Sequence, residues 1–594
     1  LVRYGGDEFI ILMPNTNTKG VLELAQRIIA GLNAQPILNH PIRCSIGFSV
    51  FPNDATTIEV LINQADNLMY QAKKQGKNRI GLKPEITKKL IIPSPVTIGR
   101  EKETDWCLNQ LKECNAILIA GEAGIGKTRL VYETRGHLGN PIVFRGNSYA
   151  ALSLVPYHPF KNMFEELLQQ QPELTNRILG QLPEAYRSEV QKFFPEGKIA
   201  GPAASEALDH FRLYNSVGKF LLKMAESLAP TSILVLIDDL HWADQSTCEL
   251  LDFLLRSIRE KIHFFATYRV EEIRHAPVSA LLGIWAREKL YAQIRLSPLN
   301  ETQATQLLES MMGAVSPATA KFIYHESGGN PFYMEELLRE LERQRKIYWN
   351  GKEWIFHKDQ EFTIPSSIEE TISRKLRFLN PEVKSVLEAM AVFGQEFSPA
   401  LIALASQRNV GEILDALDEL FRLGFIKERA ADLYFFSEDI VRQIIYRKIT
   451  RADLVKHHRT VGEAIEDFHR NALPNYAEQL AHHFTLANDT FKALAYSKQA
   501  AFKAKQNYAY QSATKFLDNA LKFEDNIEEI FKLKSALAEI YSLAGKHALA
   551  IQNFQDCLKI NPGAARIYHD LGKVYEQKGA YRDHSAEDRM ILDD

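Results

Sequence analysis

Cysteine is scarce in this chain, and its few copies are widely separated. The 594 residues include five cysteines, none of which forms a C-x-x-C pair. They are Cys44, Cys107, Cys114, Cys248 and Cys557. This usage argues against a disulfide framework or a cysteine-based zinc site, and it indicates reduced thiols in a cytoplasmic protein.

An excess of charge of one sign is also missing. Lysine and arginine number 71 against 74 acidic residues, which gives a net charge of −3. This balance excludes an overall basic field for nucleic acid, although it leaves a local patch open. No apolar run approaches the roughly 18 residues of a membrane span, so we expect no membrane segment in this chain. Its length predicts about three to five domains.

The motif that organises the chain is the glycine-rich stretch 121–128, Gly-Glu-Ala-Gly-Ile-Gly-Lys-Thr. It follows the apolar run 116–120, which predicts a buried parallel strand, and precedes residues 129–133, which predict a helix. A phosphate-binding loop (P-loop) requires this strand–loop–helix setting. A glycine-rich turn that binds nothing is the alternative, and the complete motif spacing argues against it.

The residue types of this loop suit a nucleotide with Mg²⁺. Gly121, Gly124 and Gly126 let main-chain N–H groups surround a phosphate, and the helix N-terminus adds positive potential. Lys127 reaches the outer phosphates, and Thr128 ligates Mg²⁺. The sequence therefore predicts a nucleotide-binding protein.

A second stretch, 232–239, is a continuous apolar run that ends in two acids. It predicts a central parallel strand with carboxylates at its C-terminal edge. Because it follows a P-loop, we assign Asp238 to Mg²⁺, through water, and Asp239 to the attacking water, in preference to a helix cap. His241 is a candidate base or metal ligand, but packing at the strand exit is favoured because no partner spacing supports either role.

Residues 240–244, Leu-His-Trp-Ala-Asp, complete a resemblance to the AAA-like ATPase module of STAND proteins, which are signal-transduction ATPases. The resemblance implies ATP as the nucleotide. It makes Arg269, at the end of the predicted strand 262–269, a catalytic sensor of the γ-phosphate; a surface arginine is the alternative. It also implies that Pro331, in a helical lid, touches the nucleotide.

A linker and the segment leading into the ATPase are expected over residues 86–112. Prolines and mixed polarity indicate the linker. Residues 98–103, Ile-Gly-Arg-Glu-Lys-Glu, resemble the start of the STAND module, which places Arg100 against the nucleotide. The ATPase with its helical lid is then expected over residues 113–345.

The first residues hold another motif. Residues 2–9 contain two glycines followed by two acids, which indicate a hairpin tip that admits a phosphate while carboxylates hold a divalent ion. Together with residues 44–52 and 61–79, they resemble the C-terminal half of a GGDEF domain, the family of diguanylate cyclases that join two GTP molecules into cyclic di-GMP. We expect this partial α/β domain over residues 1–85, with an apolar strand at 10–14.

The GGDEF resemblance also assigns residues. Asp7 and Glu8 would be metal ligands for a GTP–Mg²⁺ complex. The nucleotide contacts would come from Gly5, Gly6, Lys73 and Lys77. Lys77 stands where the family usually has arginine, which loses two-pronged hydrogen bonding. Further metal-binding and guanine-reading residues would lie upstream of Leu1, so we expect no cyclic di-GMP from this chain alone.

Residues 346–475 predict a helix-rich region that resembles the winged-helix module following the ATPase in STAND proteins. No basic run marks its second helix, which favours a structural role over DNA binding. Glu438 stands where relatives commonly place a histidine near the β-phosphate. A carboxylate there repels phosphate, which argues against tight retention of ADP.

Residues 476–594 predict stacked helix pairs of the tetratricopeptide repeat (TPR) type. The positions that match a repeat of about 34 residues are Leu537, Ala538, Tyr541, Gly545, Ala550, Phe554 and Pro562. The same offset leads to Leu571, Gly572, Tyr575 and Gly579. Such arrays present a concave face, so we expect a protein partner there.

The predicted fold class is therefore multidomain α/β plus α: a partial GGDEF domain, a P-loop ATPase with helical and winged-helix lids, and a TPR-like α-solenoid. The favoured function is an ATP-binding signalling switch with slow hydrolysis, coupled to a GGDEF output. One alternative is a diguanylate cyclase in a longer parent protein, regulated by the ATPase and the repeats. The other is a TPR interaction scaffold whose ATP site is vestigial.

Overall fold

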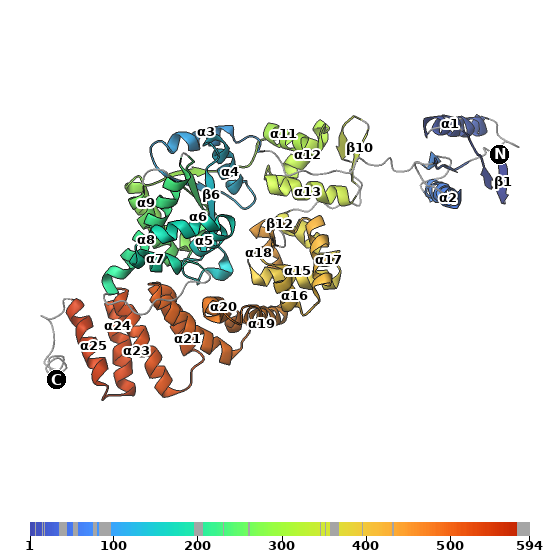
Figure 1. The fold of residues 1–594 in the computed structure, drawn as a ribbon. Helices are drawn as coiled ribbons and strands as arrows, with labels where there is room; N and C mark the ends of the chain where they lie inside the picture. The colour runs from blue at the N-terminus through green and yellow to red at the C-terminus, as the bar shows by residue number, and fades with distance from the viewer. Residues whose placement is uncertain are drawn as a thin grey trace. The chain divides into compact units, whose positions relative to one another are not determined.

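The chain divides into two compact units. A computed structural model describes residues 1–5, 8–14, 16, 18–34, 44–51, 58–74, 80–81, 97–194, 206–229, 231–258, 262–344, 346–350, 352–356, 367–394, 396–430 and 433–578. The first unit comprises Leu1–Pro93, Met311–Ser316 and Arg345–His357, and the second comprises Ser94–Ser310, Pro317–Gln344 and Lys358–Asp594. Figure 1 labels their helices and strands. The linker expected from residue 86 lies, up to residue 96, outside the described residues.

The first unit contains short strands and two long helices. Strand β1 (Val2–Gly5) pairs antiparallel with β2 (Glu8–Ile10). The other elements are α1 (Thr18–Ala34), β3 (Ile46–Gly47), α2 (Ile58–Lys74), β4 (Ile80–Gly81), β10 (Ile347–Trp349) and β11 (Trp354–Phe356). Strands β3 and β4 are parallel, and β10 and β11 are antiparallel.

The strand expected over residues 10–14 is wrong, because β2 covers Glu8–Ile10 instead. The pairing with β1 ends where Val2 meets Ile10. Beyond that point Leu12 is 78% exposed. An apolar run locates a strand only where a neighbouring strand accepts its hydrogen bonds, and the sequence does not show where that neighbour ends.

The second unit is built on a five-stranded parallel sheet. Its strands are β5 (Ala116–Ala120), β6 (Ile142–Asn147), β7 (Ile233–Asp238), β8 (Ile262–Tyr268) and β9 (Ala292–Arg295). Their order across the sheet is β6-β7-β8-β5-β9. The two apolar runs expected to be buried strands form β5 and β7. Both strands lie inside the sheet, so this prediction is confirmed.

Helices cover both faces of this sheet (Figure 1). The helices of this domain are α3 (Glu101–Gln110), α4 (Lys127–His137), α5 (His158–Gln170), α6 (Pro172–Gln181), α7 (Glu184–Gln191), α8 (Glu206–Leu228), α9 (Gln245–Ser257) and α10 (Ser279–Arg287), with short turns η1 (Ala150–Leu152), η2 (Leu240–Trp242) and η3 (Ile273–His275). Alternate strand residues point to opposite faces. In β7, Val235 joins the core that includes Phe160 and Leu254, whereas Leu236 joins the smaller core with Leu130 of α4.

Further along the chain, helices lead to a winged-helix arrangement. The lid helices are α11 (Glu301–Met312), α12 (Pro317–Ser327) and α13 (Pro331–Arg343), followed by α14 (Ile368–Arg377), α15 (Pro381–Phe393), α16 (Pro399–Ser406), α17 (Val410–Arg422), β12 (Ile426–Ala430), β13 (Leu433–Phe436), α18 (Asp439–Lys448) and α19 (Arg451–Phe468). Strands β12 and β13 form a hairpin, and Phe397 bridges to Tyr434 of β13. Helices α15, α16 and α17, followed by this hairpin, confirm the expected winged helix.

The chain continues as stacked helices, consistent with the α-solenoid expectation. They are η4 (Leu473–Tyr476), α20 (Ala477–Leu486), α21 (Thr490–Gln506), α22 (Tyr510–Leu521), α23 (Ile527–Leu543), α24 (His547–Ile560) and α25 (Ala565–Gln577). The repeat positions Leu537, Ala538, Ala550, Phe554 and Leu571 are buried between them. Gly579 lies outside the described residues.

The structure also bears on the cysteines and on membrane crossing. The five cysteines all lie in the described part of the chain, and no disulfide joins them. Among the described helices, none combines the length and the apolar character needed to cross a membrane.

Candidate functional site

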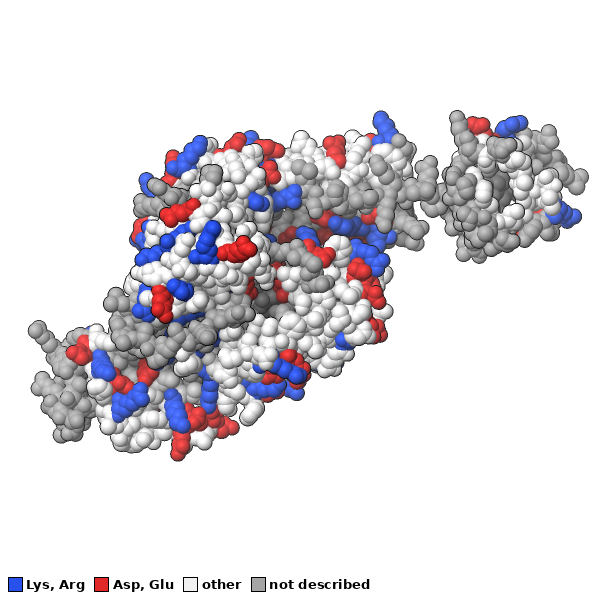
Figure 2. All heavy atoms as spheres, viewed as in Figure 1, with Lys and Arg blue, Asp and Glu red and all other residues white. Residues whose placement is uncertain are grey.

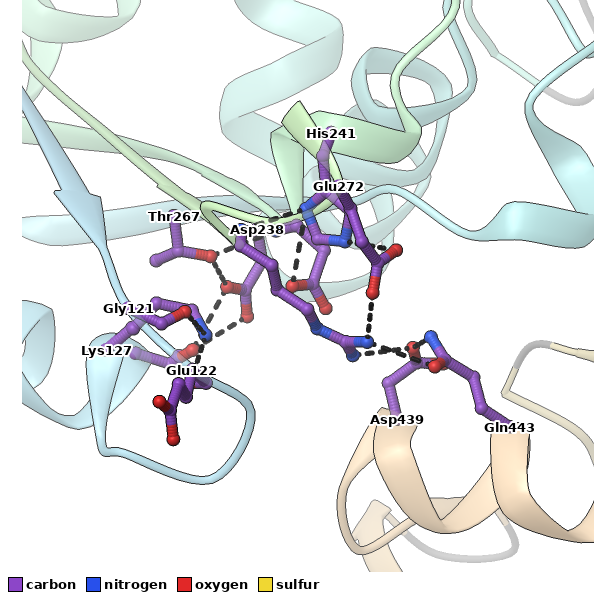
Figure 3. Close-up of polar contacts among 12 residues, drawn as sticks. Gly121, Glu122, Lys127, Asp238, His241, Thr267, Glu272, Asp439 and Gln443 are labelled. Carbon is purple, nitrogen blue, oxygen red and sulfur yellow. Dashed lines mark hydrogen bonds and ion pairs between the residues drawn. The ribbon is translucent and has the colours of Figure 1, made fainter. Parts of the chain in front are cut away.

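The P-loop joins the end of β5 to the start of α4. Gly126 caps α4 with a φ of 98°, and Gly124 has a φ of 74°, a left-handed conformation that favours glycine. The side chain of Lys127 is buried, and its Nζ donates to the carbonyl oxygens of Gly121 at 3.1 Å and Glu122 at 2.9 Å (Figure 3). Burial lowers the pKa of Lys127 from its usual range. A phosphate would supply the anionic partner that these carbonyls do not.

Asp238 at the end of β7 accepts hydrogen bonds from three side chains. Thr128 Oγ1 donates to both carboxylate oxygens, at 3.0 and 3.1 Å. Thr267 of β8 donates to Oδ1, and Arg145 of β6 donates to Oδ2 at 2.7 Å. Although burial opposes ionisation, Arg145 and the two threonines hold the pKa of Asp238 below its usual value. The predicted Mg²⁺ ligands Thr128 and Asp238 are thus adjacent, and the carboxylate is ionised.

Asp239 differs sharply from its neighbour. Its backbone has a φ of 54°, and its N–H donates to Thr267 Oγ1 at 3.0 Å. Burial, together with the carboxylates of Asp238 and Asp439, raises the pKa of Asp239 to about 7. A carboxyl group with this pKa exchanges a proton near neutral pH, which is the property required of a general base.

Arg269 follows β8 and is buried, with 6% of the residue exposed, so the surface-arginine alternative is wrong. Its Nη1 donates to Glu272 Oε1 at 2.8 Å and to Gln443 Oε1 at 3.0 Å. Its Nη2 donates to Asp439 Oδ2 at 3.1 Å. Figure 3 shows Asp439 and Gln443 on their helix, facing the residues of the sheet edge. The expected phosphate sensor is therefore bonded to α18 of the winged-helix region.

His241 is enclosed at the strand exit. Its Nδ1 accepts the N–H of Arg269 at 3.4 Å, and its Nε2 lies 3.5 Å from Glu272 Oε2. Burial and the charge of Arg269 lower the pKa of His241 to about 3. The ring is therefore neutral near pH 7, in keeping with the expected packing role.

The start of α13 contacts the P-loop directly. Asn330 Nδ2 donates to the carbonyl of Ala123 at 3.0 Å, and the N–H of Phe332 donates to the carbonyl of Gly124 at 3.3 Å. A Cβ on Gly124 would come within 2.7 Å of the Phe332 Cβ. Pro331 lies between these two contacts as the first residue of α13. The lid proline therefore lies beside the P-loop, and its contact with a nucleotide stays a prediction.

Arg100 braces the P-loop. Its Nη2 donates to the carbonyls of Ile125, at 3.2 Å, and Ser297, at 2.8 Å, while Nη1 donates to Glu103 at 3.0 Å. The guanidinium is buried. Arg100 thus lies at the P-loop and stabilises its main chain through hydrogen bonds. Its contact with a nucleotide stays a prediction.

Glu438 caps α18 without a side-chain hydrogen bond to the helix. Burial and the nearby carboxylate of Asp238 raise its pKa, while Lys427 and Lys127 oppose the rise. Glu438 therefore lies in the electrostatic environment of the P-loop, as expected from its position in sequence.

In the first unit, two predicted residues of the GTP site meet. Lys73 Nζ lies 3.2 Å from Glu8 Oε1, and both side chains are about two-fifths exposed. Gly5 ends β1. The other predicted residues, Gly6, Asp7 and Lys77, lie outside the described residues.

The polar residues of the site that were not predicted from the sequence include Arg145, Thr267, Glu272, Asp439 and Gln443. The available signal for Arg145 was a charged residue inside the apolar strand β6, where burial demands a partner. For Asp439 and Gln443 there was the acid at the start of α18, which is equally typical of an ordinary helix N-terminus.

On the face drawn in Figure 2, the charges of the described residues do not single out a nucleic-acid surface. In the view of Figure 2, acidic and basic side chains of the described residues are interspersed over both the sheet domain and the repeats. This agrees with the near-neutral composition.

This geometry is that of a P-loop nucleotide site, and residues 97–266 match the family model "AAA ATPase domain". The chain contains an AAA ATPase domain. Residues 1–79 match the model "Diguanylate cyclase, GGDEF domain", so a GGDEF segment precedes the ATPase domain.

Similar proteins reflect both parts. The protein R02095 of Rhizobium meliloti is 22% identical over 497 residues, which cover 78% of this chain and 45% of that protein. The biofilm architecture maintenance protein MbaA of Vibrio cholerae is 41% identical over 83 residues, or 13% of this chain and 10% of that protein. The chain thus spans less than half of either relative.

Among solved structures, a STAND protein with a tetratricopeptide repeat sensor from Pyrococcus horikoshii is similar, with a TM-score of 0.42 and 16% identity over 86% of this chain and 71% of that one.

Proposed function

We propose that this chain is a STAND-type, ATP-dependent signalling switch. The observation that carries the proposal is the bonding of Arg269 to Asp439 and Gln443 of α18. A residue at the edge of the nucleotide site thereby also holds the winged-helix region. A phosphate that attracts Arg269 competes with α18 for the same guanidinium, so ATP binding and the position of α18 are coupled.

The residues fit ATP with Mg²⁺. The glycines of the P-loop and Lys127 would hold the phosphates, and Thr128 and Asp238 would hold the metal ion, whose charge offsets that of the phosphates. Asp239, with a pKa of about 7, would orient and deprotonate the attacking water. Slow hydrolysis would then reset the switch.

The repeats would respond because they are bonded to the ATPase domain. Lys161 Nζ of α5 lies 3.8 Å from Glu478 Oε1 of α20, and Lys503 of α21 donates to Glu478 Oε2 at 2.7 Å. Glu478 is only 1% exposed. A rearrangement of the ATPase domain changes the surroundings of this buried carboxylate, which supports a role of the repeats in sensing a protein partner.

The test is to identify the nucleotide that the protein holds. The purified chain and its Lys127→Ala variant are denatured, and the released nucleotide is identified. In a separate experiment, ATP is titrated into native samples of both proteins from which bound nucleotide has been removed. We expect adenine nucleotide from the unmodified chain and none from Lys127→Ala. Lys219→Ala, which removes an exposed lysine of α8 outside the P-loop, serves as the control and should behave as the unmodified chain.

Equal ATP binding by the unmodified chain and Lys127→Ala would contradict the proposed site. No ATP binding by any of the three proteins would favour the alternative of a TPR scaffold with a vestigial site.

A second proposed function is diguanylate cyclase output of the GGDEF segment in a longer parent protein, regulated by the ATPase and the repeats. The match over residues 1–79 and the contact between Lys73 and Glu8 favour it. We expect no cyclic di-GMP when the purified chain is incubated with GTP and Mg²⁺. Its appearance would make the cyclase the leading function.

A further inference from the structure

Asp238 has three side-chain donors among the described residues. Thr128 belongs to the P-loop and Thr267 to strand β8, whereas Arg145 lies outside both. It lies in β6, and its Nη2 donates to Asp238 Oδ2 at 2.7 Å. Side-chain exposure is 26% for Arg145 and 10% for Asp238. Because Val143, two residues earlier, packs on the core that contains Leu130, Arg145 also lies on the α4 face of the sheet.

Three side-chain donors occupy most of the acceptor capacity of the Asp238 carboxylate. Thr128 donates to both oxygens, Thr267 to Oδ1 and Arg145 to Oδ2. An ionised carboxylate accepts about four hydrogen bonds. Because Thr128 shares its one hydroxyl hydrogen between the two oxygens, about one acceptor site stays open. Water ligands of Mg²⁺ that make more than one hydrogen bond to Asp238 have to replace one of these donors.

Arg145 is the donor that can leave. The hydroxyl of Thr128 can bind a metal ion through its oxygen while its hydrogen still points at Asp238. Thr267 is fixed from a second side, because its Oγ1 also accepts the N–H of Asp239. The buried Nε of Arg145 has no hydrogen-bond partner in the described structure, so this guanidinium is less firmly anchored.

We propose that Arg145 is a positioning residue that occupies Asp238 until Mg²⁺ displaces it. Guanidinium and metal ion are both cations and compete for one carboxylate, so the ion pair sets the Mg²⁺ concentration at which the site accepts a metal–nucleotide complex. The inference rests on the proposed ATP function, because it concerns how Mg²⁺ binding to that same site is regulated.

The experiment measures binding of a fluorescent ATP analogue at fixed concentration while Mg²⁺ is varied. Arg145→Gln should lower the Mg²⁺ concentration at half effect by about tenfold, since it removes a charged hydrogen bond. Arg145→Lys, which keeps the charge on a shorter reach, should fall between Arg145→Gln and the unmodified chain. Arg135→Gln is the matched control. Arg135 lies in the last turn of α4, away from the P-loop, and donates to the Pro141 carbonyl. This variant should leave the midpoint unchanged.

As a second readout, the melting temperature of each protein is measured at saturating ATP while the Mg²⁺ concentration is varied. The same measurement reports whether each variant is folded. Its Mg²⁺ midpoint should shift in the same direction. An unchanged or higher midpoint in both folded Arg145 variants would overturn the inference. If Lys127→Ala loses ATP binding while the Arg145 variants keep the original midpoint, only this inference fails. Absence of ATP binding by the unmodified chain would reject the proposed function, and this inference with it.

Discussion

Arg269 and Asp439 are 170 residues apart in the sequence, yet Nη2 of the arginine donates to Oδ2 of the aspartate over 3.1 Å. Asp439 is the first residue of α18, so the bond joins the end of a central strand to the winged-helix region. Both side chains are largely withdrawn from solvent. In the proposed switch, this bond is the contact that a bound phosphate weakens.

Replacing Asp439 tests the bond from the lid side. Asp439→Asn removes the charge while keeping the shape, so we expect the free energy of unfolding to fall by about 1.5–3 kcal/mol and ATP turnover to rise. Urea unfolding and steady-state phosphate release measure the two effects. Asp415→Asn, at an exposed position of α17, is the control. Unchanged turnover in a folded Asp439→Asn protein would show that the bond does not restrain the site.

The pKa of Asp239 predicts the pH dependence of hydrolysis. Burial and neighbouring carboxylates raise this pKa to about 7, and the basic, ionised form is populated above it. ATP turnover should therefore rise as the pH passes from below this pKa to above it, with a midpoint near 7 set by this residue. Asp239→Asn should lower turnover by roughly 10²–10⁴-fold and flatten the profile, while ATP binding is spared. A profile that keeps the same midpoint in Asp239→Asn would assign the titration to another group.

The P-loop glycine beneath the lid should resist substitution. At Gly124 a Cβ would approach the Phe332 Cβ to 2.7 Å, and the φ of 74° disfavours any side chain. Gly124→Ala should cost roughly 1–2 kcal/mol from the backbone alone and weaken ATP binding.

Gly136→Ala is the matched control for this substitution. Gly136 lies in α4, and a Cβ at this position would meet no other atom within 4 Å, so alanine should be neutral or stabilising by roughly 0.5–1 kcal/mol. Titration of ATP and thermal melting distinguish the two variants. Equal ATP affinity in both would mean that the lid contact does not shape the site.

A buried histidine pair predicts sensitivity to acid. His458 Nδ1 lies 3.0 Å from His483 Nδ1, and His458 Nε2 lies 3.0 Å from Tyr446 Oη. Burial, with His482 and His457 nearby, lowers the pKa of His458 to about 3. The unfolded chain, with a pKa near 6.5, then binds more protons between pH 6.5 and 3, so stability falls as the pH drops through this window.

At about pH 5 the loss from His458 alone should be about 2 kcal/mol. Urea unfolding at neutral pH and at this lower pH measures it, and His458→Gln should reduce the difference. His325→Gln, at an exposed position of α12, is the control. The same pH sensitivity in His458→Gln and the unmodified chain would contradict the assignment.

Local signals in the sequence were enough for the main elements of the fold. The apolar runs that became β5 and β7 predicted strands because both faces of a parallel sheet are buried. The P-loop motif located the start of α4, and the repeat positions Leu537 and Phe554 located a packed helix pair. In each case the signal lies within a single element or a pair of neighbouring elements.

The polar contacts of the site depended on distant segments and could not be predicted in the same way. Arg145 and Asp238 are 93 residues apart in the sequence. Gln443 contacts Arg269 from α18 of the winged-helix region. A buried charge shows that a partner is needed, but only the folded chain shows which one. The misplaced strand at residues 10–14 has a related cause, since pairing rather than hydrophobicity ended β2 at Ile10.

Hydrogen exchange at the backbone amides of α18 tests the switch most directly. It is measured without nucleotide and with ATP and Mg²⁺, in the unmodified chain and in Lys127→Ala. We expect faster exchange in α18 when ATP is bound to the unmodified chain, because Arg269 leaves Asp439 and Gln443, and no change in Lys127→Ala. Identical exchange in α18 with and without ATP, under conditions where ATP is bound, would contradict the coupling between the nucleotide site and the winged-helix region.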